Sequence, residues 1–454
     1  MTLVAGIDLG STTTKAILMD EAGAVVGRGI TNSRSNYHLA TRIAMDEATI
    51  NARFGLLRRD LEATSGLERD LLRGAAAEFL DRLELDFRRA QYLMQLDALR
   101  DSALQEAAGP RLAARSSAIT SRLGPLFDEM AREAHESDGH AQRSQFFRDE
   151  SASRFGEHAQ RLADRDVPYD LLLGIFDKAI GQVEGRVFDR SFERCIRSAL
   201  AESRLPVAEP RTAGSPTPTP RAALRAAVSA AVARILAADV EPAVTIGTGY
   251  GRQRLPFPKE QIRSEILCHG LGAHSMFPGT RTVLDIGGQD TKAIQVDDRG
   301  IVTSFQMNDR CAAGCGRYLG YIADEMNLGV HELGPLAQRS TRSVKITSTC
   351  TVFAGAELRD RLTLGQRRED ILAGLHRAMM LRAMSLLARS GGIEDEFTFT
   401  GGVASNPAAV DALTKLVGEN YGGRRINISP GSIYTGALGA ALFARTVLRE
   451  RRGD

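Results

Sequence analysis

Residues suited to binding phosphate are concentrated in a short segment near the start of the chain. Asp8 and Gly10 are followed by a hydroxyl-rich turn, Ser11–Thr14, and then by Lys15. A glycine allows the backbone to approach a phosphate closely, and the N–H and hydroxyl groups of such a turn can donate hydrogen bonds to its oxygens. Lysine adds a compact positive charge, and an aspartate can hold Mg²⁺ through water. Together these residue types predict a phosphate-binding loop.

The same arrangement recurs in the second half of the chain. Aligned without gaps, residues 8–25 and 285–302 share nine identical residues, namely Asp8/Asp285, Gly10/Gly287, Thr14/Thr291, Lys15/Lys292, Ala16/Ala293, Ile17/Ile294, Asp20/Asp297, Gly23/Gly300 and Val25/Val302. An internal repeat of this kind indicates two similar domains, each opening with an antiparallel pair of strands. Two such loops can hold the phosphates of one nucleotide from both sides. The alternative is a pair of ordinary hairpins, which the second copy and the Gly401-Gly402 pair after an apolar strand disfavour.

The nucleotide-binding patterns of two other folds do not fit this sequence. The G-x-x-x-x-G-K-[ST] pattern of P-loop proteins does not occur. Residues 247–251, GTGYG, follow a predicted strand but lack the glycine spacing of a dinucleotide-binding fold. We expect them to form a loop near the junction of the two domains.

Two of the five cysteines occupy positions suited to ligands of a metal cluster. Cys311 follows Asn308–Asp309 and Cys350 follows Ser348–Thr349, and residues of these types cap the N-terminus of a helix. The positive end of a helix lowers the pKa of a thiol and stabilises an anionic ligand such as an iron–sulfur cluster. The C-x-x-C spacing of a zinc knuckle does not occur. Buried, unreactive cysteines are the alternative interpretation.

The cysteine count leaves the ligand set of such a cluster open. A 4Fe–4S cluster takes four thiolates, so either a second chain supplies two of them or Cys315 and Cys268 complete the set. Cys315 lies one helical turn after Cys311 and is expected to be a packed side chain. Cys268 precedes His269 in a predicted helix, SEILCHGLGAH, and is expected to be structural. Cys195 lies in the helical middle of the chain and is expected to be unreactive.

The predicted elements place these motifs on two α/β domains interrupted by an all-helical insertion. Apolar residues at three- and four-residue spacing predict amphipathic helices in the insertion, and a Pro- and Thr-rich linker follows it. The expected divisions are domain I at 1–44 and 221–280, the insertion at 45–203, the linker at 204–220, domain II at 281–432, and a C-terminal helix at 433–454 that packs on domain I. The expected strands are 4–9, 15–19, 25–30, 243–246, 301–307 and 396–400, and the expected helices are 221–238, 312–326, 352–362, 369–390 and 435–450.

The composition is that of an ordinary globular protein, with 43% hydrophobic and 25% charged residues among 454. Lys+Arg number 58 and Asp+Glu 56, and this balance excludes a strongly basic nucleic-acid binder and an acidic disordered chain. We find no run of ~18 apolar residues and no signal-peptide pattern, so we expect a cytoplasmic protein without a membrane span. In a reducing compartment, a few cysteines of odd number are more often ligands or nucleophiles than disulfides.

Seven segments resemble the BadF/BadG/BcrA/BcrD ATPase family, which comprises activators of 2-hydroxyacyl-CoA dehydratases and ATPase subunits of benzoyl-CoA reductase. The segments are IDLGSTTTKA, TGYGR, SEILCHG, LDIGGQDTK, NDRCAAGCGRYL, STCTVFAGAEL and FTGGVASN. The resemblance covers residues 1–45 and 221–450. It implies the fold of the superfamily of acetate and sugar kinases, heat-shock chaperones and actin, in which two ribonuclease-H-like domains flank an ATP cleft.

The resemblance also implies roles for individual residues. It implies catalytic roles for Asp8, Lys15 and Asp285 around ATP and Mg²⁺, with the two aspartates organising the metal ion and the attacking water. The nucleotide-binding residues that it implies are Gly10, Ser11, Thr12, Thr13, Gly287, Gly288, Gln289, Gly401 and Gly402. Cys311 and Cys350 correspond to the ligands of a 4Fe–4S cluster that is shared across a dimer interface.

The sequence departs from the family pattern in two places. Cys315 stands where the activators usually have threonine, and simple activators lack the helical insertion. The insertion makes the chain resemble most the larger ATPase subunit of ATP-dependent benzoyl-CoA reductase. The expected partners are a smaller paralogous ATPase subunit that shares the cluster, the catalytic benzoyl-CoA-binding subunits, and reduced ferredoxin, with no nucleic acid and no membrane.

The function implied is ATP-driven delivery of low-potential electrons from ferredoxin to subunits that dearomatise benzoyl-CoA during anaerobic aromatic degradation. The alternative is an activator of a 2-hydroxyacyl-CoA dehydratase, which would be the same machine with a different catalytic partner. A sugar or acyl-phosphate kinase, or a filament- or chaperone-like interaction protein, would use the same fold. Neither of these would need Cys311 and Cys350, and iron analysis separates them from the electron carriers.

Overall fold

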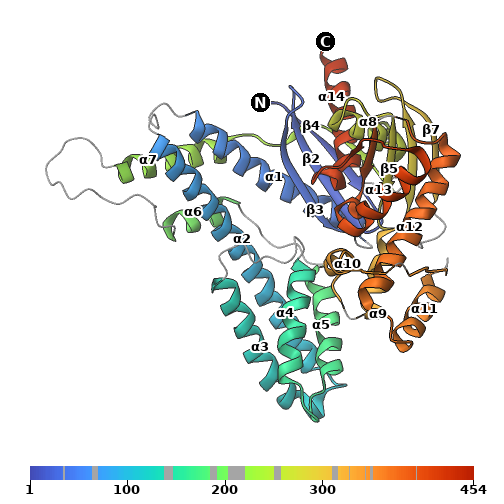
Figure 1. Ribbon diagram of the computed structural model, residues 1–454. Coiled ribbons are helices and arrows are strands. Elements are labelled where there is room, and N and C mark those ends of the chain that lie inside the picture. Colours follow the sequence, from blue (N-terminus) through green and yellow to red (C-terminus); the bar gives the residue numbers. More distant parts are fainter. Residues whose placement is uncertain are drawn as a thin grey trace. The chain divides into compact units, whose positions relative to one another are not determined.

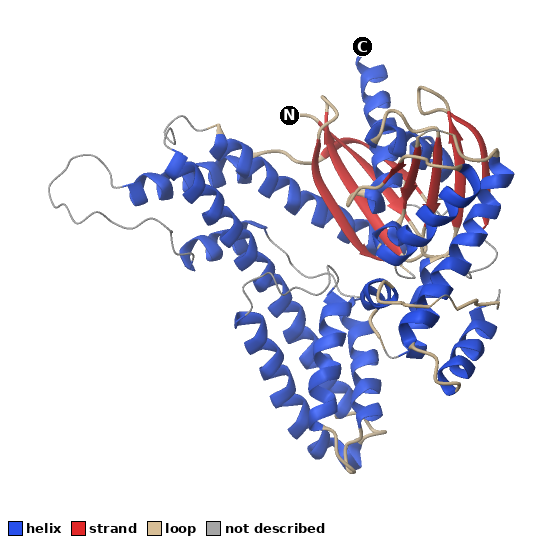
Figure 2. Ribbon diagram, viewed as in Figure 1, coloured by secondary structure: helices blue, strands red, loops and turns tan. Residues whose placement is uncertain are grey.

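The computed structural model describes residues 1–33, 36–63, 70–136, 147–184, 192–202, 220–249, 257–308, 315–326, 328–342, 344–347, 351–394 and 396–453. These residues form two compact units (Figure 1). The first unit contains residues 1–52 and 239–454, and the second contains residues 53–238. The strands belong to the first unit, whereas the described residues of the second form helices and turns (Figure 2).

The first sheet has the strand order β3-β2-β1-β4. Its strands are β1 (Leu3–Leu9), β2 (Thr13–Asp20), β3 (Val25–Asn32) and β4 (Pro242–Thr248). β1 pairs antiparallel with β2 and parallel with β4, and all seven of its residues are buried. A strand covered on both faces reads as a continuous apolar run, which accounts for the LVAGIDL sequence of β1.

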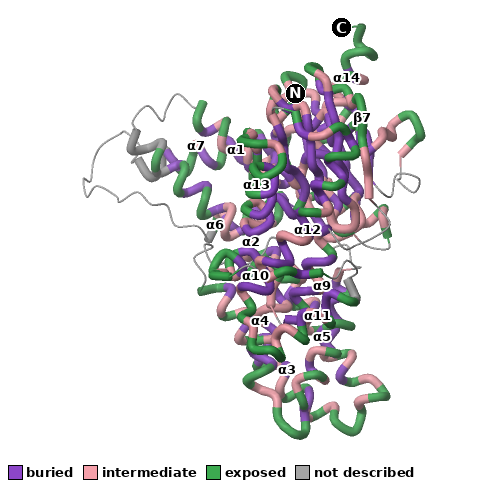
Figure 3. The backbone as a smooth tube through the Cα atoms, turned by 45° about the vertical axis from the view of Figure 1, so that its right-hand side comes forward, coloured by how far each residue is buried: buried purple, intermediate pink, exposed green. Residues whose placement is uncertain are grey.

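The second sheet has the order β7-β6-β5-β8-β9 and repeats the first around its central strand. Its strands are β5 (Thr282–Ile286), β6 (Thr291–Val296), β7 (Val302–Asn308), β8 (Phe397–Thr400) and β9 (Ile426–Asn427). β5 pairs antiparallel with β6 and parallel with β8, as β1 pairs with β2 and β4. The central strands of both sheets are buried (Figure 3).

The registers of the two hairpins are the same residue for residue. Asp8 stands opposite Lys15 in the first hairpin, and Asp285 stands opposite Lys292 in the second. The nine identities of the repeat therefore occupy equivalent places in two related sheets. The structure has the two matching strand pairs that the internal repeat predicted, one in each sheet.

Two helices pass between the sheets and touch backbone to backbone. α8 (Glu265–Met276) leads from β4 to β5, and α14 (Thr435–Arg452) is the C-terminal helix. A Cβ atom on Gly272 would lie 2.1 Å from the carbonyl oxygen of Thr435, and one on Gly439 would lie 1.9 Å from that of Cys268. Only glycine permits this separation, because any side chain at either position would overlap the other helix.

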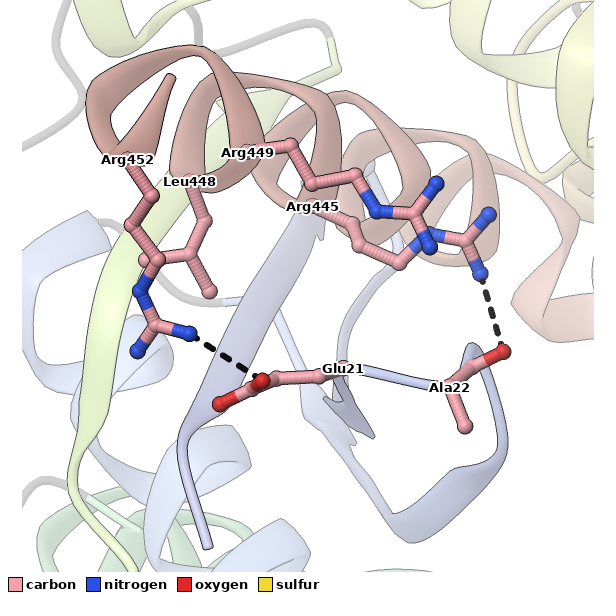
Figure 4. A pocket seen from close by; sticks show the side chains of 6 residues that line it. All are labelled: Glu21, Ala22, Arg445, Leu448, Arg449 and Arg452. Atoms are coloured by element: carbon pink, nitrogen blue, oxygen red, sulfur yellow. Dashed lines mark hydrogen bonds and ion pairs between the residues drawn. The ribbon is translucent and has the colours of Figure 1, made fainter. Parts of the chain in front are cut away.

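α14 also lies directly on the first sheet. A Cβ atom on Gly6 of β1 would stand 2.1 Å from the carbonyl oxygen of Ala437. Near the end of the helix, Arg452 forms an ion pair of 3.0 Å with Glu21, and Arg445 donates to the carbonyl oxygen of Ala22 at 3.3 Å (Figure 4). These contacts hold the C-terminal turns against the β2–β3 turn.

Five further helices of the first unit pack together with the second sheet. They are α9 (Gly316–Met326), α10 (Val330–Ala337), α11 (Thr351–Thr363), α12 (Arg368–Ser390) and α13 (Pro407–Tyr421). Their buried faces share one apolar cluster with β5, β6 and β8. The sequence analysis did not anticipate α10 or α13, although α13 begins with two local signals, the cap residue Asn406 and a proline at its first position.

α12 is long and apolar enough, by length and composition, to span a membrane. Its most apolar window has a mean hydropathy of 1.3, and 61% of that window is buried inside the protein. Leu375, Met379 and Leu387 belong to the apolar cluster of the second sheet. Core packing therefore accounts for the apolar character of this helix.

The second unit is a helical assembly with its own core. The helices that enter or form it are α1 (Tyr37–Glu62), α2 (Asp70–Ala107), α3 (Ser116–Glu136), α4 (Phe147–Leu162), α5 (Tyr169–Glu184), α6 (Phe192–Glu202) and α7 (Pro220–Ala237). Phe127, Phe155 and Phe176 are buried together in a cluster built from α2, α3, α4 and α5. The expected linker at 204–220 lies outside the described residues except for Pro220.

The limits of the insertion differ from those expected at residues 45 and 203. Residue 45 falls inside α1, whose first half packs on β3, since a Cβ atom on Gly29 would lie 1.9 Å from the carbonyl oxygen of Ala44. The same helix continues without a break into the second unit. α7, expected to resume the first domain, belongs instead to the second unit, where Arg234 pairs with Asp60 at 2.8 Å.

The backbone contact between α8 and α14 leads to a stability prediction. We expect Gly439→Ala to lower the free energy of unfolding by about 1–3 kcal/mol, because the methyl group would force the two helices apart. Gly418→Ala in α13 is the matched control, since a Cβ atom there has no neighbour within 4 Å. That substitution should raise stability by about 0.5–1 kcal/mol. Urea unfolding of both variants measures the difference, and equal stability of the two would contradict the close helix contact.

Candidate functional site

The loop after β1 brings Asp8 and Lys15 together at the end of the first hairpin. The Lys15 ammonium lies 3.5 Å from Asp8 Oδ2, and Asp8 is buried. Gly10 makes room for this pair, because a Cβ atom there would lie 3.2 Å from Lys15 Nζ. The loop is tied down by Ser33, a residue that the sequence analysis missed. Its hydroxyl donates to the Gly10 carbonyl at 2.5 Å and its N–H donates to the Thr12 carbonyl at 2.7 Å.

The loop after β5 repeats this arrangement and adds a further carboxylate. Lys292 lies 3.3 Å from Asp285 Oδ2 and 2.8 Å from Asp290 Oδ1. Two carbonyl oxygens of this loop point toward α9. The Gly287 carbonyl accepts a hydrogen bond from the Gly316 N–H at 2.8 Å. The Gly288 carbonyl likewise accepts one from the Arg317 N–H at 2.7 Å.

The two predicted phosphate loops meet in the structure. A Cβ atom on Gly288 would lie 1.8 Å from the hydroxyl oxygen of Thr12, so the loops are in contact. Gln289 belongs to the second loop, and Ser11 and Thr13 belong to the first hairpin. Residues from the two halves of the chain therefore face one region, as two loops that bind one nucleotide must.

Gly401 and Gly402 lie at the same end of the second sheet. β8 runs parallel to β5, so the Gly401-Gly402 pair that follows it lies beside the end of β5. Gly401 has φ = +86°, and a Cβ atom there would lie 2.3 Å from the carbonyl oxygen of Ile286. This left-handed conformation and close approach both require glycine. The pair is thus adjacent to the loop that begins at Gly287.

Gly249 lies directly against Asp8. The sequence analysis placed its segment, GTGYG, only near the junction of the two domains. Gly249 has φ = +106°, and a Cβ atom there would lie 2.8 Å from Asp8 Oδ1. Thr248 precedes it and donates its hydroxyl to the Arg263 carbonyl at 2.9 Å. The chain therefore turns sharply against the Asp8 carboxylate.

α8 contributes two buried ionisable residues that the sequence analysis also missed as site residues. Glu265 begins the helix, and His269 follows one turn later. His269 Nδ1 lies 3.3 Å from Asp285 Oδ1, and the Thr400 hydroxyl donates to the same oxygen at 2.9 Å. The available signal was an acidic residue and a histidine four positions apart in SEILCHG, a spacing that puts both on one helix face.

Burial and pairing shift the pKa values of these groups. Burial acts to raise the pKa of Asp285, but the charges of His269 and Lys292 outweigh it and hold that pKa well below its usual range. Burial acts to lower the pKa of Lys292, and the charges of Asp285 and Asp290 raise it instead. The pKa of His269 is raised in the same way, against burial, by Asp285. Burial raises the pKa of Glu265.

Three of the five cysteines lie among the residues that the structure describes, and the other two lie outside them. Cys311 and Cys350, the predicted cluster ligands, lie outside the described residues. Cys315 is buried in the apolar cluster of the second sheet. Cys268 of α8 is buried in an apolar cluster with residues of α14 and the first sheet, and burial raises the pKa of its thiol to about 12. Within the described parts of the chain, no group of three His, Cys, Asp or Glu side chains is arranged to hold a metal ion.

The assembled groups suit a magnesium nucleotide. Two buried aspartates, each beside a lysine, stand at the ends of equivalent central strands. Gly10, Gly287 and Gly288 keep the adjoining backbone free of side chains that would crowd these loops. Carboxylates and waters are the ligands Mg²⁺ prefers, and lysines and backbone N–H groups bind phosphate. This donor set fits MgATP.

The position of Asp8 predicts the effect of its removal. Asp8→Asn removes one of the two carboxylates that we expect to organise Mg²⁺ and the attacking water, so magnesium-dependent ATP hydrolysis should fall at least ~100-fold. Asp20→Asn is the matched control, since Asp20 belongs to the same repeat but accepts a hydrogen bond from the Ala24 N–H in a turn at 2.8 Å. Phosphate release measures both, and hydrolysis by the Asp8 variant at the parental rate would remove Asp8 from the site.

Comparison with known proteins shows which family the chain resembles. The sequence profile of the BadF/BadG/BcrA/BcrD ATPase family matches residues 5–444. The (R)-2-hydroxyglutaryl-CoA dehydratase activating ATPase of Acidaminococcus fermentans is 45% identical over 202 residues, which are 44% of this chain and 75% of that protein. One of the subunits of benzoyl-CoA reductase from Thauera aromatica is 31% identical over 211 residues, which are 46% of this chain and 73% of that protein.

A solved structure supports the fold. The crystal structure of Acidaminococcus fermentans (R)-2-hydroxyglutaryl-CoA dehydratase component A superposes with a TM-score of 0.53 at 23% identity, covering 98% of this chain and 99% of that chain. The predicted fold class, two ribonuclease-H-like domains with a helical insertion in the first, is confirmed. Because the family profile extends over nearly the whole chain, the chain belongs to the BadF/BadG/BcrA/BcrD ATPase family.

Proposed function

We propose that this chain is the ATP-hydrolysing, electron-activating component of an acyl-CoA-transforming oxidoreductase system. ATP bound between the loops that begin at Gly10 and Gly287 is hydrolysed with Asp8, Asp285 and Lys15 around the phosphates. The free energy released drives an electron at low potential from a reduced donor such as ferredoxin to a separate catalytic partner. The acyl-CoA substrate binds to that partner and not to this chain.

The observation that carries this proposal is the hydrogen-bonded link between the second phosphate loop and α9. The carbonyls of Gly287 and Gly288 accept hydrogen bonds from the N–H groups of Gly316 and Arg317, at the first turn of α9. Cys311 precedes this turn by five residues. A movement of the loop on binding or losing the γ-phosphate is therefore passed to the backbone that follows this cysteine.

The helices that follow the two predicted ligand cysteines are neighbours, which supports a common site. α9 follows Cys311 and α11 follows Cys350. Arg359 of α11 forms an ion pair with Glu325 of α9, and a Cβ atom on Gly355 would lie 2.5 Å from the Tyr321 hydroxyl. We propose that Cys311 and Cys350 supply two ligands of a 4Fe–4S cluster and that a second chain supplies the other two. Such a cluster supplies the one-electron carrier.

The surface of α11 suits contact with a second chain. Phe353 of α11 is 68% exposed and Leu364, the residue directly after the helix, is 77% exposed. Large apolar side chains exposed to this degree are typical of interfaces. We propose that this chain pairs through the α9–α11 region with a partner carrying the same two helices. A paralogous subunit and a second copy of this chain both meet that requirement.

The comparisons favour a dehydratase as the catalytic partner. The activating ATPase of (R)-2-hydroxyglutaryl-CoA dehydratase is 45% identical to this chain, whereas the benzoyl-CoA reductase relative is 31% identical over a similar length. We therefore propose activation of a 2-hydroxyacyl-CoA dehydratase ahead of the benzoyl-CoA reductase role that the insertion suggested.

Benzoyl-CoA reductase remains the second candidate because of one specific observation. The 202 residues aligned with the activating ATPase account for only 44% of this chain, which also contains the helical unit at residues 53–238. An insertion of this size is expected for the larger ATPase subunit of that reductase. Electron transfer assays with each class of partner subunit distinguish the two roles.

We propose that the helical unit at residues 53–238 docks the catalytic partner or the electron donor. Its described surface carries no large exposed apolar side chain, since those identified in the described chain all lie in the other unit. Docking there is therefore polar. Both ends of the unit are close together, because Arg53 donates to the Ile235 carbonyl at 2.7 Å.

The ligand assignment predicts how three cysteine variants behave. Cys311→Ser and Cys350→Ser should each remove the cluster and electron transfer, while Cys315→Thr should keep both. The expected iron content of the parental protein is about four per dimer. Iron analysis and EPR of the anaerobically purified, reduced protein provide the measurement. About four irons per isolated monomer, lost with Cys315, would place the cluster inside one chain and overturn the shared site.

The docking assignment predicts a separation of activities. Replacing residues 53–238 by a short flexible linker should preserve nucleotide binding, because the phosphate loops lie entirely in the other unit. Electron transfer to the partner should be lost. Fluorescent nucleotide binding and partner reduction are measured on the same monodisperse preparation. Complete loss of nucleotide binding in a folded deletion variant would contradict this separation of activities.

A further inference from the structure

His269 lies between the two aspartates of the site. It occupies the middle of α8, the helix that leads from the first sheet to the second, and only 7% of it is exposed. Its Nδ1 atom is 3.3 Å from Asp285 Oδ1. Its Nε2 atom lies on the side of Asp8, because Nε2 and Asp8 Oδ2 are 2.8 and 2.9 Å from the point where a Cβ atom on Gly436 would stand.

The two aspartates are restrained unequally. The Asp285 carboxylate is held on both oxygens, since Oδ1 meets Thr400 and His269 while Oδ2 meets Lys292. Asp8 forms an ion pair of 3.5 Å with Lys15. Among the described residues, no histidine forms an ion pair with Asp8 as His269 does with Asp285. The repeat therefore places equivalent carboxylates in different surroundings, and α8 is the source of the difference.

The contact between His269 and Asp285 is close but not aligned as a hydrogen bond. Nδ1 has no aligned hydrogen-bond partner among the described residues, although it is buried and 3.3 Å from the carboxylate oxygen. Hydrogen bonds around a reaction centre are often long without the substrate and tighten when it binds. A small rotation of the imidazole, which is rigid and planar, would align Nδ1 with Oδ1.

From this placement we infer that His269 is a positioning residue for ATP hydrolysis, which holds the Asp285 carboxylate toward the magnesium nucleotide at a set spacing from Asp8. The inference rests on the proposed nucleotide site. It also explains why residue 436 is a glycine, since any side chain there would displace both His269 and Asp8. It also gives α8 a role beyond joining the two sheets.

Substitutions at His269 test the inference. His269→Leu should lower kcat for ATP hydrolysis by about 10–100-fold and raise the Mg²⁺ concentration for half-maximal rate, as losing a residue behind a metal-binding carboxylate does. Its KM for ATP should change little, because no phosphate contact is removed. His269→Asn should recover most of the rate, since its amide nitrogen takes the place of Nδ1.

A control substitution on the same helix and a second substitution at the site complete the test. His274→Asn, at the end of the same helix and beside Gly300, should keep kcat within about twofold, because no site residue is altered. Gly436→Ala approaches the site from α14 and should lower kcat even where His269→Leu folds poorly. Titration of ADPNP binding with Mg²⁺ gives a readout independent of turnover, and we expect weaker Mg²⁺ coupling in both site variants.

The outcomes separate this inference from the proposed function. A parental protein that hydrolyses no ATP would overturn the proposed function itself. A parental protein that hydrolyses ATP, with His269→Leu matching its kcat and Mg²⁺ dependence, would overturn only the positioning role. A loss of rate that His269→Asn fails to recover, with unchanged Mg²⁺ coupling, would also count against it and indicate a packing role.

Discussion

The backbone contact between α8 and α14 determines the geometry on which the site depends. Each helix presents glycines to the other, and at Gly272 and Gly439 the two backbones approach to distances that exclude a side chain. α14 is in turn seated on β1 at Gly6, and α8 leads directly into β5. The separation of the two helices therefore sets the separation of the central strands, and with it that of Asp8 and Asp285.

Placing two carboxylates and two lysines in a buried site is costly unless the charges are paired. The second repeat is paired more completely, with Lys292 shared between Asp285 and Asp290 and with His269 nearby. This pairing keeps Asp285 ionised, because the favourable charges outweigh burial and lower its pKa. A fixed, ionised carboxylate beside a less restrained one is a suitable arrangement for a hydrated Mg²⁺ ion. Duplication of the hairpin thus produced two similar loops whose differences arise from the helices around them.

The second phosphate loop has two faces with different partners. One face meets Thr12 of the first loop, and its carbonyls bond to the first turn of α9. α9 is joined to α11 by the Arg359–Glu325 ion pair. In the proposed function this continuity matters, because a change at the nucleotide reaches the segments after both predicted ligand cysteines through hydrogen bonds and packed helices. No long-range mechanism beyond these contacts is needed.

Local sequence pattern was enough to predict the two hairpins and their repeat. Asp8 and Lys15 are seven residues apart across a hairpin, so local strand pairing alone brings them together. The predicted ligands Cys311 and Cys350 lie outside the described residues and still rest on sequence. Local pattern also located α9, α11, α12 and α14 to within a few residues, because each has a periodic apolar face or a clear capping signal.

The other residues beside the two aspartates, and the start of the insertion, depend on tertiary packing. Glu265, His269 and Gly249 reach the aspartates through the packing of α8 and the turn after β4, and no local pattern encodes contacts across such separations. α1 continues unbroken from one unit into the other, so no change of secondary structure marks the boundary. Helix formation depends on hydrogen bonds within a segment, whereas membership of a site or unit depends on distant residues that the segment cannot specify.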